Sequence, residues 1–396
     1  MLLEAERKRV IDAMEAQGLS MLLTVQDTTE AHYRGKRASE FLGSMTYEHQ
    51  KGFFLHNHVA FTPSGNPLGL FDQFHFNRSA ESLGTLKARR KSRPFEEKES
   101  YRWLAQFERL QAAMADFPSV KVVDICDREA DIQELLQARR YDHVHYLIRS
   151  RGDRKAEGSD LTIRQEVSQT PVLGTYQVEV HDEKGKYVRT ATLSVQTTRL
   201  TVNGRIAYKR HLTPTEITVL LATETDAPEG TEPLEWLLVT SLEVNSLEDA
   251  LQVVGFYALR WRIELFHYVL KQGYQIEELQ LKNPQALQNA IVLYSLMALQ
   301  VMRLRYWAQE QPQAPMQLAG FDPLSFKVAA LYLNTKANAR YEADKQQPTV
   351  QDFLTAVAHL GGSMLWKHKP IGLKTLWRGQ LLLDDLMVAY RAFQRE

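Results

Sequence analysis

Between residues 21 and 150 the chain alternates strand-like and helix-like segments in the order strand, strand, strand, helix, strand, helix, strand. The strand-like segments are apolar runs bounded by turn residues, and the helical ones repeat apolar residues every three or four positions. The strands cover residues 21–29, 120–125, 143–150 and two runs around a Pro-Ser-Gly-Asn-Pro turn within 52–76; the helices cover 100–117 and the segment after Asp127. This order predicts an α/β fold with a mixed sheet flanked by helices.

The composition permits a large core and excludes several kinds of site. A chain of 396 residues with 44% hydrophobic residues can bury a substantial interior. The single cysteine, Cys126, excludes a disulfide framework and a Cys-rich zinc site, and we expect it to be a small buried side chain. No histidine lies in a zinc-hydrolase pattern such as His-Glu-x-x-His.

The charge balance gives no general attraction to nucleic acid. Forty-eight basic residues match 48 acidic ones, so DNA binding has to come from local patches. Residues 87–93 and 149–155 are two such basic segments, although a short charge run is usually a solvated loop. The N-terminus lacks the apolar core of a signal peptide, and the longest apolar run, around residues 290–299, is too short to span a bilayer. We therefore expect a soluble cytoplasmic protein that does not bind membranes.

The rest of the chain changes character twice. Residues 151–246 read as a β-rich insertion, because short strand-like runs alternate with turn residues. The chain is then strongly helical to about Gln311, where prolines indicate a linker. We expect residues 1–311 to form one domain and residues 312–396 a smaller helical region. A helix is predicted to start at Thr349, where "TVQD" has capping-box spacing.

Two carboxylates follow apolar strands. Asp27 ends the strand at 21–29, and Asp127 follows the strand at 120–125. Aspartate is also a preferred helix N-cap, so Asp127 alone does not identify a site.

A third carboxylate lies on a predicted helix at residues 247–271. On a helical projection Phe256 and Ile263 belong to a core stripe, while Tyr257, Arg260, Glu264 and Lys271 share an adjacent arc of roughly 60°. The simplest reading of that arc is an exposed ion-pair ladder, since Arg260 and Glu264 are four residues apart. The alternative is a metal site, because carboxylates from three separate elements can hold two Mg²⁺ ions for in-line phosphoryl transfer.

These residues also carry a family resemblance. "QDTT" with Asp27, "CDREADI" with Asp127, and "YALRWRIELFHYVLK" from Tyr257 to Lys271 resemble the DDE transposases of bacterial insertion sequences. The branch with the Tyr-Arg-Glu-Lys signature, which includes the transposon-five transposase, is the most similar. Further similar blocks are "EKESYRWL", "PLEWLLVTS" and "HLGGSMLWKHKPIG".

The resemblance implies a ribonuclease-H-like core, with the β-rich insertion lying between the second Asp and the Glu. It implies that Asp27, Asp127 and Glu264 are catalytic and bind two Mg²⁺ ions, for which Mn²⁺ can substitute. The implied reaction cuts transposon ends by nicking, hairpin formation and hairpin opening, and joins them to target DNA. Implied partners are double-stranded DNA and a second copy of the chain in a synaptic dimer, paired through residues 312–396, with Trp366 and Trp377 in the pairing segment.

The resemblance also assigns DNA contacts. Tyr257, Arg260 and Lys271 match residues that hold phosphates near the cleavage point, and Arg149 matches another backbone contact. Trp236 matches a tryptophan that stacks on a flipped base; the alternative is an ordinary core tryptophan. His267 is a further candidate for DNA contact, although a lone histidine on a helix is more often structural.

One departure from the family concerns the N-terminus. Family members have a helical end-recognition domain before "QDTT", whereas Asp27 here follows a single helix-like segment. The sequence therefore leaves two hypotheses. The chain is a transposase catalytic core, or it is a short form without end recognition that dimerises with full-length transposase and inhibits it.

Overall fold

The structure is a computed structural model, and it describes most of the chain. The described residues are 2–33, 42–45, 50–77, 93–152, 154–181, 187–203, 206–207, 210–281, 283–336, 340–363 and 371–394. Trp366 and nearly all of the basic segment 87–93 lie outside these residues.

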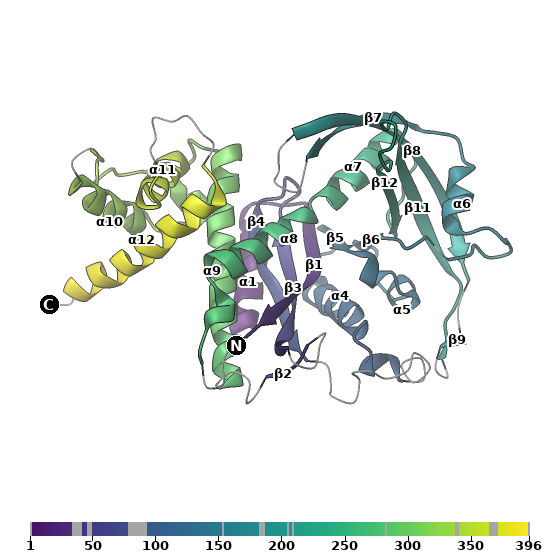
Figure 1. Ribbon diagram of the computed structural model, residues 1–396, viewed down its shortest axis with the longest axis horizontal. Coiled ribbons are helices and arrows are strands. Elements are labelled where there is room, and N and C mark those ends of the chain that lie inside the picture. Colours follow the sequence, from purple (N-terminus) through teal and green to yellow (C-terminus); the bar gives the residue numbers. More distant parts are fainter. Residues whose placement is uncertain are drawn as a thin grey trace.

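A large mixed sheet forms the centre of the molecule (Figure 1). Its strands are β1 (Met21–His32), β2 (Gly43–Ser44), β3 (Lys51–Phe61), β4 (Pro67–Phe76), β5 (Lys121–Cys126), β6 (Val144–Arg149), β7 (Gly174–His181), β8 (Tyr187–Val202), β11 (Thr215–Glu224) and β12 (Glu235–Thr240). A separate short pair joins β9 (Ile206–Ala207) to β10 (Arg210–His211).

The first half of the sheet has the predicted order. β1 pairs antiparallel with β3, and β3 pairs antiparallel with β4. On its other edge β1 pairs parallel with β5, which pairs parallel with β6. This mixed α/β arrangement is compatible with a ribonuclease-H-like transposase fold.

The β-rich insertion continues the same sheet. β12 pairs antiparallel with β6, and the order then runs through β11 and β8 to β7. The apolar run of β11 explains this position, because its residues Ile217 to Ala222 are buried on both faces. A strand covered on both sides belongs in the interior of a sheet.

Helices cover both faces of the sheet. One face packs on α1 (Leu2–Ala16), α4 (Tyr101–Met114), α5 (Gln133–Leu136) and α6 (Ile163–Ser168). The other packs on α7 (Leu247–Ala258), α8 (Trp261–Tyr268) and α9 (Pro284–Glu310). Beyond α9 lie α10 (Pro323–Asn334), α11 (Val350–Leu360) and α12 (Leu373–Phe393), on the side of Figure 1 away from the insertion.

The prediction of one continuous helix over residues 247–271 was wrong. α7 ends at Ala258, α8 starts at Trp261, and a π-helical turn covers Val269–Gly273. At the break, backbone amides bond three residues back, as in Arg262 N–H to Leu259 O at 2.9 Å. This tight 3₁₀ turn interrupts the helix without a proline or glycine at the break. The predicted core stripe is confirmed at Phe256 and Ile263, which are both buried.

The C-terminal helices share a core with the rest of the chain. α11 and α12 pack on α9, and Trp377 of α12 contacts the ring of Tyr268 edge-on at 5.5 Å. A Cβ atom at Gly379 would collide with the carbonyl oxygen of Val357, so glycine lets α12 cross α11 closely. The predicted capping box at Thr349 is present: its hydroxyl accepts from Asp352 N–H and the Asp352 carboxylate accepts from Thr349 N–H.

α9 is the element nearest to a membrane span. Its 27 residues are long and apolar enough to cross a bilayer, contrary to the expectation from the shorter run at 290–299. Half of its most apolar window is buried inside the protein, as in a core helix.

Candidate active site

Parallel pairing of β1 and β5 brings the two aspartates to the same edge of the sheet. Val25 lies opposite Ile125, so Asp27 and Asp127 each come two residues after a paired position. Asp127 follows the carboxyl end of β5, a common place for binding sites in α/β proteins. Asp27 lies within β1 and not at its end as predicted, because β1 continues to His32 along β3 and Asp27 pairs there with Asn57. The sequence prediction that these two carboxylates are close together is consistent with this register.

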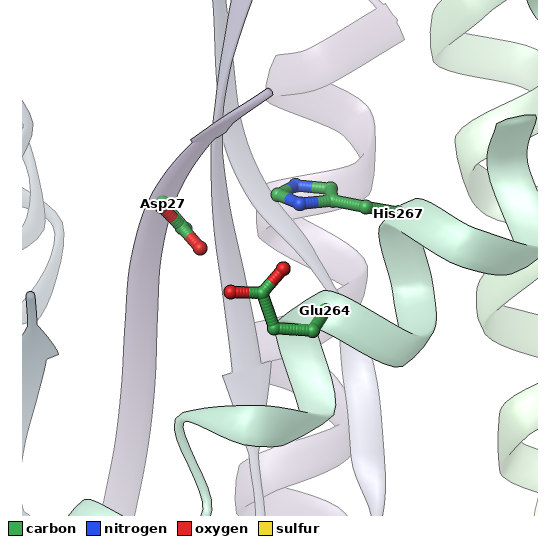
Figure 2. A group of neighbouring side chains, drawn as sticks. All are labelled: Asp27, Glu264 and His267. Atoms are coloured by element: carbon green, nitrogen blue, oxygen red, sulfur yellow. The ribbon is translucent and has the colours of Figure 1, made fainter. Parts of the chain in front are cut away.

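α8 adds the third carboxylate from the helix layer. Figure 2 shows the carboxylates of Asp27 and Glu264 turned toward one another, with the His267 ring beside them. Arg260 lies at the break before α8 and contacts both: its Nη1 donates to Asp27 Oδ2 at 3.2 Å and to Glu264 Oε1 at 3.1 Å. The predicted Arg260–Glu264 pair therefore exists, and it extends to Asp27 instead of remaining an exposed ladder on one helix.

The three carboxylates line one pocket. The lining residues are Asp27, Asp127, Arg128, Arg149, Tyr257, Arg260 and Glu264. The pocket is open to solvent at one side, because Glu264 keeps 41% of its side chain exposed. Negative charge from three elements and positive charge from the surrounding arginines thus meet in one place.

Among the carboxylates of the pocket, Asp27 has the most strongly raised pKa. Burial, then Glu264 and then Asp127 raise the pKa of Asp27 to about 7, while Arg260 opposes this rise. Burial also raises the pKa of Asp127. Carboxylates crowded in this way repel one another, and a divalent cation would relieve the repulsion.

Asp127 has two roles in the structure. Its Oδ1 accepts from Glu129 N–H at 2.8 Å and caps the 3₁₀ turn Arg128–Ala130. The helix predicted directly after Asp127 is instead this short turn followed by α5. The carboxylate also lines the pocket, so its N-cap role does not exclude a role in the site.

Aromatic and basic side chains form the wall of the pocket. Tyr257 is 5% exposed, and its ring meets that of half-buried Trp236 edge-on with centroids 6.2 Å apart. Arg149 donates from Nη2 to Glu235 O at 3.3 Å, while its buried Nε has no hydrogen-bond partner among the described residues. An unsatisfied guanidinium N–H at a pocket wall is suited to a phosphate oxygen.

Lys271 and His267 are not among the residues that line the pocket. Lys271 Nζ is 4.0 Å from Glu277 Oε1, at the π-helical turn that bends the chain after α8. His267 is 6% exposed, and its Nε2 lies 2.9 Å from Asn57 Nδ2. Burial lowers the pKa of His267 to about 3, so the ring is neutral at neutral pH. Its neighbours are therefore the carboxylates and Asn57 and not the protein surface.

Sequence reasoning did not find Arg128 or Arg102. Arg128 follows Asp127 directly and lines the pocket from an exposed position. Arg102 on α4 is buried and donates from Nε to Thr28 Oγ1 at 3.0 Å, and from Nη2 to Glu129. The "EKESYRWL" block was a signal for Arg102, but its contacts depend on residues distant in sequence.

The donor set fits a divalent cation. Among the described residues, Asp27, Glu264 and His267 each offer one ligand atom, and these atoms lie within 4.8 Å of one another. Asp127 lines the same pocket but lies outside this group. Carboxylate oxygens are the ligands that hard divalent cations prefer.

A family model and a solved structure match parts of this chain. Residues 107–300 match the family model of the transposase DDE domain, a span that includes Asp127 and Glu264. The chain is also similar to a solved structure described as a piggyBac transposase synaptic complex with hairpin DNA, at 8% identity and a TM-score of 0.36, over 71% of this chain. It spans 46% of the length of that transposase chain. The likeness to the transposase DDE domain therefore covers just under half of the chain.

Proposed function

We propose that this chain is the catalytic core of a cut-and-paste DNA transposase that uses Mg²⁺, with Asp27, Asp127 and Glu264 as the metal ligands. The observation that carries the proposal is the single pocket lined by these three carboxylates and by basic side chains. The match of residues 107–300 to the transposase DDE domain supports the same reaction class. The Tyr-Arg-Glu-Lys branch, with its ribonuclease-H-like core, is the branch we propose, acting in the bacterial cytoplasm.

In the proposed reaction the carboxylates of the pocket bind metal ions and Arg149 binds phosphate. When bound, two divalent ions would activate the attacking oxygen and neutralise charge at the phosphorus. Asp27, Asp127 and Glu264 hold the ions. Arg149, with its free Nε, binds a phosphate oxygen beside the scissile bond.

The proposed reaction sequence has four steps. Water first cuts one strand, and the new 3′-hydroxyl then attacks the opposite strand to form a hairpin. Hairpin opening and joining to target DNA follow. Trp236 provides the platform for a base flipped out during hairpin formation, and Tyr257 supports its ring from below. Lys271 contacts the backbone farther from the carboxylates.

A second copy of the chain completes the proposed complex. Two transposon ends are cut together, so a two-fold pair of subunits is the natural assembly. We propose that residues 312–396 contribute to this pairing.

DNA cleavage and metal binding test the proposal together. We would measure nicking of supercoiled plasmid DNA with Mg²⁺ or Mn²⁺, and Mn²⁺ binding by calorimetry, for the wild type and the Asp127→Asn and Glu264→Gln variants. Both variants should lose nicking by at least about a hundredfold, because removal of a metal ligand removes the transition-state charge stabilisation. Asp160→Asn is the matched control, since Asp160 is fully exposed and remote from the pocket. Nicking that is equal in all four proteins, or absent from the wild type with both ions, would overturn the proposal.

A further inference from the structure

His267 lies one helical turn after Glu264, and its ring stands beside the carboxylates of Glu264 and Asp27 (Figure 2). Residues three apart share one face of a helix. The same Glu-x-x-His spacing places two ligands side by side in metal sites built on helices. One ligand atom from each of these three side chains lies within 4.8 Å of the other two.

The burial of His267 makes a surface role unsuitable. Its side chain is 6% exposed, and packing holds the ring in place beneath the carboxylates. As placed, Asn57 Nδ2 donates to Nε2 at 2.9 Å, which puts the ring proton on Nδ1; a rotation of the Asn57 amide reverses this bond and frees the Nδ1 lone pair for a ligand. A neutral imidazole with one free nitrogen is the form that binds metals.

Asn57 is the start of a buried polar relay behind the ring. Its Oδ1 accepts from Gln73 Nε2 at 2.7 Å, and Gln73 also bonds Ser295 Oγ at 2.9 Å and His75 Nε2 at 3.0 Å. Each member can reverse its donor and acceptor roles, by rotation of an amide or hydroxyl or by a change of tautomer. In the reversed relay Asn57 Oδ1 accepts a hydrogen bond from His267 Nε2–H. Nδ1 then keeps a lone pair that can bind a metal ion.

Such an arrangement is typical of metal-binding histidines. They usually hold their second nitrogen in a hydrogen bond that fixes the orientation and tautomer of the ring.

We infer that His267 is a nitrogen ligand of the same divalent ion that Asp27 and Glu264 bind, so that this pocket takes Co²⁺ or Mn²⁺ more tightly than Mg²⁺. The inference rests on the proposed function only for the position of the metal. Imidazole favours borderline transition ions, whereas Mg²⁺ prefers oxygen ligands. Arg260, which now bridges the two carboxylates, leaves them when the ion enters.

Pulsed electron paramagnetic resonance of the wild-type full chain with Mn²⁺ gives the first test. A directly bound imidazole produces a ¹⁴N coupling to the metal electron spin, and this measurement needs neither DNA nor a variant. We expect the coupling in the wild type and its loss in His267→Ala. A wild-type Mn²⁺ site without a ¹⁴N coupling overturns the inference.

Metal affinities give the second test. Calorimetry should show Co²⁺ binding weakened at least about tenfold by His267→Ala, with a much smaller change for Mg²⁺. Asn57→Ala should weaken Co²⁺ binding less than His267→Ala, because it loosens the ring without removing the ligand. His145→Ala is the control, since His145 lies on β6 away from the pocket. Equal Co²⁺ affinity in the wild type and His267→Ala overturns the inference.

The experiments distinguish failure of the transposase proposal from failure of the proposal that His267 is a metal ligand. If Glu264→Gln abolishes DNA nicking and the ¹⁴N coupling is absent, the transposase proposal stands and His267 is not a ligand. If the coupling is present and the wild type cuts no DNA, His267 is a ligand and the proposed reaction is wrong.

Discussion

Arg260 places its Nη1 3.2 Å from Oδ2 of Asp27, and the same nitrogen reaches Glu264 at 3.1 Å. A side-chain cation thus occupies the position between two carboxylates where a metal ion would be bound. Its charge offsets part of their repulsion and holds them in place without an ion. The 3₁₀ turn between α7 and α8 sets this geometry, because it directs Arg260 toward β1.

Replacement of Arg260 should separate metal binding from DNA cleavage. In Arg260→Gln the competing cation is gone, so we expect Mn²⁺ to bind severalfold more tightly in calorimetry. DNA nicking should fall, since a phosphate contact is lost with the guanidinium. Arg164→Gln, a change to a half-exposed arginine paired with Glu235, should alter neither quantity. Weaker Mn²⁺ binding in Arg260→Gln would show that Arg260 organises the carboxylates more than it competes for them.

The raised pKa of Asp27 predicts a pH-dependent stability for the metal-free protein. Burial and the neighbouring carboxylates raise the pKa from an unfolded value of 3.8 to about 7. The folded state therefore binds more protons in this interval, and its stability falls as the pH rises from about 4 through 7. The loss amounts to at most about 4 kcal/mol.

Asp27→Asn should remove this pH dependence. Thermal unfolding in the presence of a chelator should show the variant gaining stability relative to the wild type between pH 5 and pH 8. Saturating Mn²⁺ at pH 8 should stabilise the wild type and not the variant, because bound metal adds its binding free energy to folding. A constant difference in Tm between the two proteins at all pH values would contradict the prediction.

Arg102 should act as a positioning residue for the two aspartates. It donates to Thr28 Oγ1 and to Glu129, the two residues whose backbone N–H groups bind the carboxylates of Asp27 and Asp127. Glu129→Gln should weaken Mn²⁺ binding severalfold with little loss of stability, since Glu129 is mostly exposed. Arg102→Lys should retain more metal affinity than Arg102→Gln.

Arg109→Gln provides the comparison on the same helix. Arg109 is half-exposed and pairs with Asp72, away from the pocket. Its replacement should leave the Mn²⁺ affinity unchanged. If Glu129→Gln, Arg102→Lys and Arg102→Gln changed Tm alone, Arg102 would have a purely structural role.

Sequence patterns predicted the features of the site that depend on neighbouring residues better than those that depend on contacts between distant segments. The strand end before Asp127 and the arc of Tyr257, Arg260 and Glu264 could be read from periodicity, because each depends on neighbours within a few residues. The predicted strand end at Asp27 was wrong, because β1 continues to His32 through its pairing with β3. The break after Ala258 could not, since residues 259 and 260 carry no helix-breaking side chain and the bend comes from packing on the sheet. Pairing of β12 with β6 was also invisible, because it joins residues about 90 positions apart.

His267 shows a signal that was present but not used. Its spacing from Glu264 is a known metal-ligand spacing on helices, yet the partner Asn57 lies on β3, 210 positions away in the chain. A lone histidine is indistinguishable from a core residue until that strand is placed. That contact and the carboxylates beside the ring are the basis for proposing a metal-ligand role.

Trp236 separates two steps of the proposed reaction. It is half-buried on β12 with its ring against Tyr257, so one part of the ring stays available for stacking. On tethered DNA ends, Trp236→Ala should keep nicking within about threefold and reduce hairpin formation at least tenfold, because stacking is worth roughly 1–3 kcal/mol per base. Trp236→Phe should recover part of the hairpin product on a denaturing gel. Equal loss of nicking and hairpin formation, with a lower Tm, would support the core role of this tryptophan.

The exposed apolar side chains of α12 offer the sharpest test of subunit pairing. Truncation before residue 318 would be a poor test, because α11 and α12 bury part of α9 and their removal would expose its core face. Val388 and Phe393 are 72% and 79% exposed, so their replacement by lysine should leave the fold and Tm unchanged. If α12 forms the pairing surface, this double substitution should abolish the two-subunit DNA complex in sedimentation while single-end binding persists. Val188→Lys, at a similarly exposed valine on β8, should leave the complex intact. Persistence of the two-subunit complex in the α12 double variant would place the pairing surface elsewhere on the chain.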